Sequence, residues 1–296
     1  MCKDNAMIIT IASGKGGTGK TTVTVNLAAS INRDDVTVFD CDVEEPNSHI
    51  FIKPENISSE PISVMVPKVD TQRCTLCGAC EEICQFSAIT LVAKRIMTFP
   101  EMCHSCRGCE MVCPEDAVKE DSRVLGSVHQ GKNARGIDLT WGELRVGEAM
   151  SPPLISQVKD RINPGGIALV DAPPGTSCPA IEALRSSDYA LLVAEPTPFG
   201  LNDLALTVEA LKKLKVPTGI VINRADDAPG IVEEYAKKEG IEILQRFPFS
   251  REAASICSRG KLLVNEMPEM KALFQQLFNR LNQLLTESKE AGEVGK

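Results

Sequence analysis

The chain has 296 residues with 43% hydrophobic and 24% charged side chains, which suits a globular main domain carrying a smaller one. The formal net charge of −8 argues against a nucleic-acid binder, because affinity for a phosphate backbone comes from clustered Lys and Arg. The N-terminus shows no cationic segment followed by a long apolar run, and no apolar stretch of about 18 residues occurs, so we expect a cytoplasmic protein.

A glycine-rich segment follows the first apolar run of the chain. Residues 7–11 are apolar and β-branched and predict a strand, residues 21–31 predict a helix, and G-K-G-G-T-G-K-T lies between them. In such a loop the backbone N–H groups surround phosphate, Lys20 reaches the β- and γ-phosphates, and the Thr21 hydroxyl binds Mg²⁺. The candidate nucleotide-binding residues are Gly14, Lys15, Gly16, Gly17, Thr18, Gly19, Lys20, Thr21 and Thr22.

Two aspartates follow predicted strands further along the chain. Residues 36–39 predict a strand that ends in D-C-D-V-E-E-P-N, and residues 167–171 predict a buried strand that ends in Asp171. A carboxylate just beyond a strand on the phosphate-loop side can hold Mg²⁺ or orient the attacking water. We therefore predict that Asp42 and Asp171 act with Lys20 at one site; the alternative is that both simply end their strands in polar turns.

Three further strand and helix pairs follow, at residues 189–194 with 200–214, 218–222 with 230–239, and 241–244 with 251–258. Such alternation predicts an α/β fold with a doubly wound, mostly parallel sheet covered by helices on both faces. The last helix carries an apolar stripe but few basic residues, so we expect it to pack on the sheet, and membrane binding is the less favoured alternative.

Eight of the twelve cysteines form two runs with the spacing C-x₂-C-x₂-C-x₃-C. This is the pattern of bacterial ferredoxins with two [4Fe–4S] clusters, in which the fourth cysteine of each run ligates the other cluster. Cluster one would use Cys74, Cys77, Cys80 and Cys113, and cluster two would use Cys84, Cys103, Cys106 and Cys109. Zinc is the competing interpretation, because paired C-x₂-C units also build tetrahedral sites.

The proline that follows the second run, Pro114, is replaced by Gln85 after the first, so we expect a less rigid turn at Cys84. The change in composition predicts an inserted, small α+β ferredoxin domain at residues 62–122. The P-loop ATPase domain would then comprise residues 1–61 and 123–296.

Together these segments resemble the MinD and Mrp superfamily of P-loop ATPases with a deviant Walker A loop, in members that contain an inserted ferredoxin domain. The resemblance also covers D-A-P-P-G-T-S-C-P at residues 171–179 and E-P-T-P-F-G at 195–200. It implies that Lys15 crosses a dimer interface to the partner's nucleotide, that Asp42 lies in switch I, that Gly175 offers its N–H to the γ-phosphate, and that Asn223 binds adenine.

The resemblance further implies ATP binding, slow Mg²⁺-dependent hydrolysis, and an ATP-dependent homodimer or a heterodimer with a related ATPase. Two functions then compete: an ATPase that couples dimerisation to electron transfer, and an assembly factor or carrier for iron–sulfur or other metal clusters. The expected partner is accordingly a redox protein or a cluster-accepting protein, not nucleic acid and not a membrane. In the nitrogenase iron protein a cysteine near Cys178 holds a cluster across the dimer axis, but we expect a buried structural thiol here.

Overall fold

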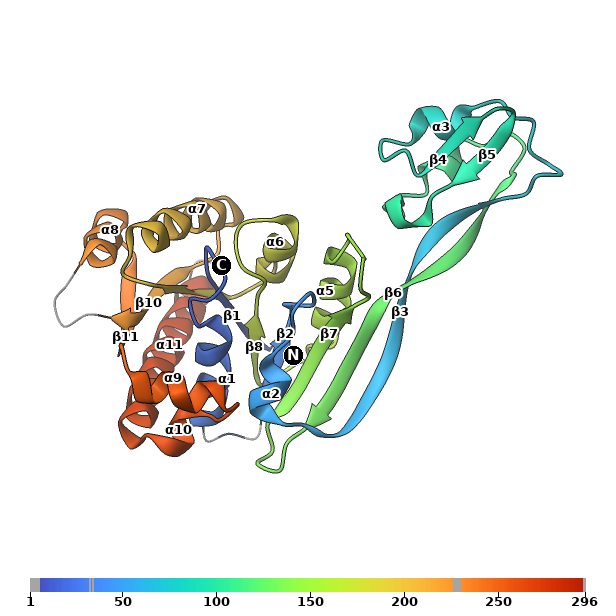
Figure 1. The fold of residues 1–296 in the computed structure, drawn as a ribbon. Helices are drawn as coiled ribbons and strands as arrows, with labels where there is room; N and C mark the ends of the chain where they lie inside the picture. The colour runs from blue at the N-terminus through green and yellow to red at the C-terminus, as the bar shows by residue number, and fades with distance from the viewer. Residues whose placement is uncertain (1–5, 32, 34, 226–229, 295–296) are drawn as a thin grey trace. The chain divides into compact units, whose positions relative to one another are not determined.

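Parallel β-strands form the centre of the protein in the computed structural model, which describes residues 6–31, 33, 35–225 and 230–294 (Figure 1). A sheet of nine strands has the order β11-β10-β9-β1-β8-β2-β7-β6-β3. Its strands are β1 (Met7–Ala12), β2 (Val36–Asp40), β3 (Glu55–Val69), β6 (Val118–Lys132), β7 (Asp138–Leu144), β8 (Ile167–Asp171), β9 (Tyr189–Ala194), β10 (Thr218–Ala225) and β11 (Glu242–Pro248).

The sheet from β11 to β7 is parallel, with β1 between β8 and β9 and with β2 between β8 and β7. All residues of β8 and β9 are buried, because helices cover both faces, and this explains their continuous apolar sequences. The carboxyl ends of parallel strands lie at one edge of the sheet, where ligands bind in folds of this kind. The predicted α/β sheet is confirmed.

Helices fill two layers against this sheet. The layer that closes the main hydrophobic core holds α1 (Lys20–Ser30), α2 (Ser48–Ile52), α9 (Arg251–Ser258), α10 (Leu263–Glu266) and α11 (Pro268–Val294). Helices α6 (Cys178–Leu184), α7 (Pro198–Leu214) and α8 (Ile231–Glu239) lie on the other face, and α5 (Pro152–Lys159) precedes β8. Phe274, Leu277 and Leu281 of α11 are fully buried in that core, as the apolar stripe predicts. No helix among the described residues is long and apolar enough to span a membrane.

The chain divides into two compact units. The first contains residues 1–59, 128–143 and 155–296, and the second contains residues 60–127 and 144–154. The sequence positions 62 and 122, where composition changes, fall inside the 15-residue strands β3 and β6, which contribute to both units. The change in composition marks the ends of the cysteine-rich segment, whereas strands β3 and β6 continue across those ends without interruption.

The second unit is built from two similar halves. In each half the cysteine run contains a short helix, α3 (Ala79–Ile83) or α4 (Gly108–Met111), and the antiparallel pair β4 (Ile89–Val92) and β5 (Arg95–Thr98) separates the runs. A 3₁₀ turn at Pro100–Met102 leads into the second run. Corresponding residues adopt the left-handed backbone conformation in both halves: Leu76 and Ser105, Gly78 and Arg107, Ser87 and Asp116.

Candidate functional site

The phosphate loop joins β1 to α1, and two of its glycines are required by their surroundings. A Cβ atom on Gly14 would lie 2.3 Å from the backbone of Asp203 in α7. Gly19 caps α1 at φ 92°, and a Cβ atom there would lie 2.4 Å from Asn223 Nδ2, which donates to the Thr18 carbonyl at 2.7 Å. Strand β10 therefore holds the outer side of the loop through Asn223.

The phosphate loop is open at its exposed tip and contains one buried hydroxyl without a hydrogen-bond partner in the described part of the chain. A Cβ atom on Gly16 or Gly17 would meet no atom within 4 Å, so the loop is open at these two residues. Thr18 Oγ1 is buried and has no hydrogen-bond partner among the described residues, an arrangement that costs free energy unless a ligand or water satisfies it. Lys20 is only 6% exposed, and the carbonyl of Thr22, in the same first turn of α1, accepts a hydrogen bond from the Asn26 side chain at 2.8 Å.

Three aspartates gather beside this loop at the carboxyl ends of β2 and β8. Asp40 and Asp171 are paired in register across the two strands, and both are fully buried. The Thr21 hydroxyl donates to Asp171 Oδ2, and the Thr24 hydroxyl lies 3.3 Å from Asp171 Oδ1. Lys20 interacts electrostatically with Asp42 and with Asp171. The structure thus brings together all four residues predicted to surround the phosphate and Mg²⁺.

Asp40 is a residue of this site to which sequence reasoning assigned no role. Its Oδ1 accepts the N–H of Asp42 at 3.1 Å, and its Oδ2 accepts the N–H groups of Asn47 and Ser48 at 3.1 and 2.9 Å. The carboxylate therefore closes the loop from Asp42 to Asn47 onto the end of β2. A carboxylate that accepts several backbone N–H groups holds a loop in one conformation. The first aspartate of the D-x-D motif has this role here, and its place in the motif is the sequence signal that could have identified it.

The buried carboxylates are held in an unusual electrostatic state. Burial, with the neighbouring Asp40 charge, raises the pKa of Asp171 to about 7, although Lys20 and the Thr21 hydrogen bond act against this rise. Burial also raises the pKa of Asp42 to about 6 against the opposing effect of Lys20. The pKa of Asp40 is raised by the same burial. A bound cation would stabilise this group, because ionising three adjacent carboxylates without a nearby positive charge costs free energy.

These raised pKa values predict that the nucleotide-free and Mg²⁺-free protein loses stability as pH rises from about 4 to about 7. In that window the folded protein keeps a proton on Asp171 that the unfolded chain has lost, so the free energy of unfolding should fall by about 1.4 kcal/mol per pH unit for one such carboxyl. Urea unfolding followed by the fluorescence of Trp141, the only tryptophan, measures it. The Asp171→Asn variant should show a flatter profile, and equal slopes in the two proteins would contradict the prediction.

Gly175 is close to the phosphate loop but its N–H is engaged. It follows β8 with φ 86° and donates to the Ser13 carbonyl at 2.9 Å, while the Ser13 hydroxyl donates to the Lys15 carbonyl at 2.7 Å. The segment after Asp171 therefore contacts the loop directly. For the Gly175 N–H to reach a γ-phosphate, its bond to Ser13 has to break.

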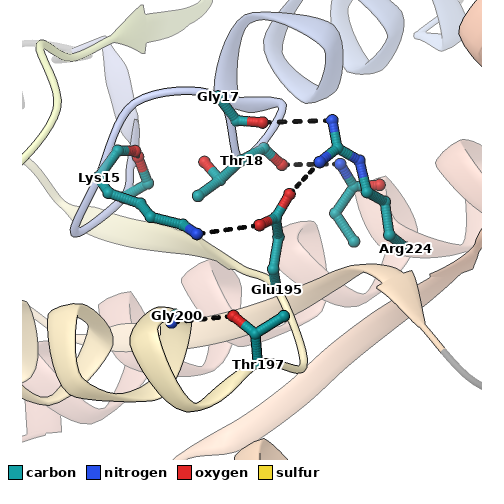
Figure 2. A network of polar contacts seen from close by, with 9 residues as sticks. Lys15, Gly17, Thr18, Glu195, Thr197, Gly200 and Arg224 are labelled. Carbon is teal, nitrogen blue, oxygen red and sulfur yellow. Dashed lines mark hydrogen bonds and ion pairs between the residues drawn. The ribbon is translucent and has the colours of Figure 1, made fainter.

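The side chain of Lys15 forms an ion pair within its own chain. Its Nζ lies 3.2 Å from Glu195 Oε2, and Arg224 pairs with Glu195 Oε1 (Figure 2). Arg224 also donates to the Gly17 carbonyl at 3.3 Å. The sequence analysis assigned no individual role to Glu195 or Arg224. Both lie at the carboxyl end of a parallel strand, which is the criterion that identified Asp42 and Asp171.

Two histidines enclose the single tryptophan next to this region. The His49 ring stacks on Trp141 at a centroid distance of 5.7 Å, and the His129 ring stacks on it at 5.0 Å. His49 belongs to α2, which follows the loop fixed by Asp40, whereas Trp141 and His129 belong to β7 and β6. Any shift of α2 therefore changes the surroundings of the Trp141 ring.

In the second unit the eight cysteines line two separate pockets, four to each. One pocket is lined by Cys74, Cys77, Cys80 and Cys113, and the other is lined by Cys84, Cys103, Cys106 and Cys109. Each pocket takes three cysteines from one run and the fourth from the other run. This grouping is the one that the ferredoxin spacing predicts.

The fourth cysteine of each run sits in the same kind of turn. The Ala88 N–H donates to Cys84 Sγ at 3.3 Å, and the Ala117 N–H donates to Cys113 Sγ at 3.2 Å. The same backbone bond closes both turns, with Pro114 in one and Gln85 in the other, and the lower rigidity expected at Cys84 stays a prediction. Donors to sulfur stabilise the thiolate form that a cluster requires.

The remaining cysteines have different surroundings. Cys41 is buried, and burial raises the pKa of its thiol well above the usual range. Cys178 was expected to be a buried structural thiol, and this was wrong: the residue is exposed at the start of α6, because the preceding residues 176 and 177 form an exposed turn. Cys257 is half-buried, and Cys2 lies outside the described residues.

Comparisons with known proteins agree with this architecture. An uncharacterized protein of Methanocaldococcus jannaschii is 30% identical over 285 residues, which cover 94% of this chain and 98% of the relative. The iron–sulfur cluster carrier protein of Pyrococcus furiosus is 25% identical over 313 residues, covering 95% and 89%. A ferredoxin-like protein from the nif region of Sinorhizobium fredii is 38% identical over 56 residues, which cover 17% of this chain and 88% of that protein.

Among solved structures, the septum site-determining protein MinD of Pyrococcus horikoshii, complexed with Mg-ADP, has a similar fold. It superposes with a TM-score of 0.57 at 21% identity, covering 94% of this chain and 97% of that one. The family profile of the CobQ/CobB/MinD/ParA nucleotide binding domain matches residues 9–264. Because that match spans most of the chain and includes the phosphate loop and all three aspartates, the protein belongs to the CobQ/CobB/MinD/ParA family of nucleotide-binding domains.

Proposed function

We propose that the protein binds and slowly hydrolyses MgATP and couples nucleotide-dependent dimerisation to electron transfer through two [4Fe–4S] clusters. Lys20 would hold the β- and γ-phosphates, while Thr21, Asp42 and Asp171 would hold Mg²⁺ and orient the attacking water. The raised pKa values of Asp42 and Asp171 support this assignment, because a cation at this point would relieve the repulsion between the carboxylates.

The observation that carries the electron-transfer half is the arrangement of the cysteines around two pockets. Four sulfurs that surround a space suit a cluster of several atoms better than one zinc ion at Zn–S distances of about 2.3 Å. A cluster with four cysteine ligands is a permanent one-electron carrier, whose potential depends on charge and on hydrogen bonds to sulfur.

The coupling would start at the loop from Asp42 to Asn47. Asp40 fixes that loop through three N–H groups, and α2, which carries His49, follows it immediately before β3 begins at Glu55. If Mg²⁺ and the γ-phosphate draw Asp42 to a new position, the Asp40 bonds and the His49 stack change with it. ATP affinity and the position of the cluster unit would then influence each other reciprocally.

Delivery of clusters to other proteins is the second candidate. Its support is the match along nearly the whole chain to proteins named iron–sulfur cluster carrier protein in two Pyrococcus species and in Methanocaldococcus jannaschii, at 24 to 25% identity. A cluster that is delivered needs exchangeable ligands, whereas each pocket here supplies four cysteines of its own. We therefore place electron transfer first.

One experiment separates these functions. Anaerobically purified protein, which by its cysteine pattern should contain about eight irons per chain, is given nucleotide-free buffer, ADP or a non-hydrolysable ATP analogue. Reduction potentials, electron-transfer rates to a small acceptor, and iron transfer to an apo-ferredoxin are then measured. Nucleotide-dependent electron-transfer rates without loss of iron support the proposal, and ATP-stimulated transfer of iron supports the carrier function.

The same samples test the coupling. Hydrogen exchange between residues 50 and 70 and the fluorescence of Trp141 should both change when the analogue binds, because α2 and the start of β3 lie in that segment. If rates, potentials, exchange and fluorescence are the same in all three states, the cluster unit does not respond to the nucleotide and the coupling hypothesis fails. The unit would then be an insertion at a position that accepts one without functional consequence.

A further inference from the structure

Glu195 connects two cations that lie on opposite sides of its carboxylate. Its Oε2 accepts Lys15 at 3.2 Å, its Oε1 accepts Arg224, and the side chain is only 10% exposed (Figure 2). A carboxylate that is largely removed from water needs a counter-ion, and here it has one from the phosphate loop and one from the end of β10. The two cations differ in freedom, because Arg224 also bonds to the Gly17 carbonyl whereas Lys15 has one ion-pair partner in this set.

The backbone around Glu195 is fixed. The Thr197 N–H donates to the Glu195 carbonyl at 2.8 Å, and the Thr197 side chain caps α7 by accepting the Gly200 N–H at 3.0 Å. A Cβ atom on Gly200 would lie 2.5 Å from the Glu195 carbonyl oxygen, so this turn admits no larger residue. The carboxylate is therefore a fixed point. Both cations have partly exposed side chains, Lys15 at 34% and Arg224 at 53%, but Arg224 has a second anchor at the Gly17 carbonyl, so Lys15 is the cation held by Glu195 alone among these contacts.

We propose that Glu195 is a positioning residue that holds Lys15 on its own chain until a nucleotide-bound partner competes for it, and that Arg224 keeps Glu195 paired after Lys15 leaves. The inference rests on the proposed function in one respect, namely that Lys15 acts across an ATP-dependent dimer. Because Arg224 stays on Glu195, transfer of Lys15 leaves no unpaired carboxylate behind. The strength of the Lys15 to Glu195 contact then sets how readily the dimer forms.

Substitutions on the two sides of Glu195 should act in opposite directions. Glu195→Gln removes the charge that retains Lys15, so dimerisation with a non-hydrolysable ATP analogue should strengthen about two- to five-fold, the range of a partly exposed ion pair. Arg224→Gln leaves Lys15 as the only ion-pair partner of Glu195 within this group. Glu195 should then hold Lys15 more firmly, so dimerisation should weaken. The acylation rate of Lys15 in the double variant should match that in Glu195→Gln, because without the carboxylate the only remaining effect of losing Arg224 is the loss of its hydrogen bond to the Gly17 carbonyl.

The test measures two properties of each variant. The rate at which an N-hydroxysuccinimide ester acylates Lys15 in the nucleotide-free protein, read by peptide mass spectrometry, should rise in Glu195→Gln and fall in Arg224→Gln. Sedimentation with the analogue gives the dimer constant. Glu239→Gln is the matched control, since it breaks an ion pair with Lys212 on the surface of the same unit.

Each outcome is decisive. If the wild type dimerises and Glu195→Gln matches Glu239→Gln in both measurements, the inference is wrong while the proposed function stands. If both single variants change in the same direction, a general loss of structure explains them and the inference is wrong. If the wild type does not dimerise with the analogue at all, the proposed function fails. The inference then fails as well, because it depends on that dimer.

Discussion

Replacing Lys20 by alanine is expected to weaken MgATP binding by about 30-fold or more, and to abolish measurable hydrolysis. Lys20 is 6% exposed and interacts with both Asp42 and Asp171, so its removal takes a buried cation away from a group of buried carboxylates. Loss of one member of a buried, hydrogen-bonded charge pair costs about 2–5 kcal/mol, and about 1.4 kcal/mol corresponds to a factor of ten. Isothermal titration calorimetry of the purified protein measures the change.

The Lys212→Ala variant is the control, because Lys212 forms an exposed ion pair with Glu239 on α7 and α8 and should leave the affinity unchanged. Lys20→Arg separates charge from shape: it keeps the cation but replaces an ammonium that fits inside the loop by a larger planar group. An unaltered ATP affinity in Lys20→Ala would exclude the phosphate loop as the nucleotide site.

Most of the nucleotide site could be predicted from sequence because its parts lie at the ends of strands. The bounds of β8 were predicted correctly, since the apolar run from Ile167 ends in Asp171 and is followed by Pro173, Pro174 and Gly175, which cannot continue a strand of this kind. Local chemistry therefore identified Lys20, Thr21, Asp42 and Asp171. Glu195 and Arg224 were not predicted because, unlike Lys20, Thr21, Asp42 and Asp171, neither side chain has an expected role in binding phosphate or Mg²⁺; they meet once β9 and β10 are paired.

Exposure was harder to predict than position. Cys178 was assigned to the interior because the sequence offers no identifiable second ligand for a bridging cluster, and a cysteine without a ligand role behaves as a small apolar residue. Its exposure depends instead on the turn that precedes α6, which sequence does not fix. The closing turn at Cys84 is a different case: the missing proline predicts a less rigid chain, and the Ala88 N–H still donates to the sulfur four residues earlier, as the Ala117 N–H does to Cys113. The same local hydrogen bond forms with and without the proline.

The second large effect concerns which cysteines share a cluster. The Cys113→Ala variant should lose the cluster held with Cys74, Cys77 and Cys80, and it should keep the other, because Cys113 lines the pocket of the first run. Iron should fall from about eight to about four per chain, since each pocket holds one [4Fe–4S] cluster by this pattern. Iron analysis and low-temperature electron paramagnetic resonance of the reduced, anaerobic protein measure the loss and identify the cluster that remains.

The matched variants decide the pairing. If the fourth cysteine serves the other run, the spectrum of Cys113→Ala should equal that of Cys74→Ala and differ from that of Cys103→Ala. The two spectra should be distinguishable, because one pocket is lined by Glu115 and the other by His104 and Arg107, whose different charges alter the potential of the cluster they face. A Cys113→Ala spectrum that equals Cys103→Ala would mean that each run binds its own cluster, and stoichiometric zinc in place of iron would overturn the cluster assignment altogether.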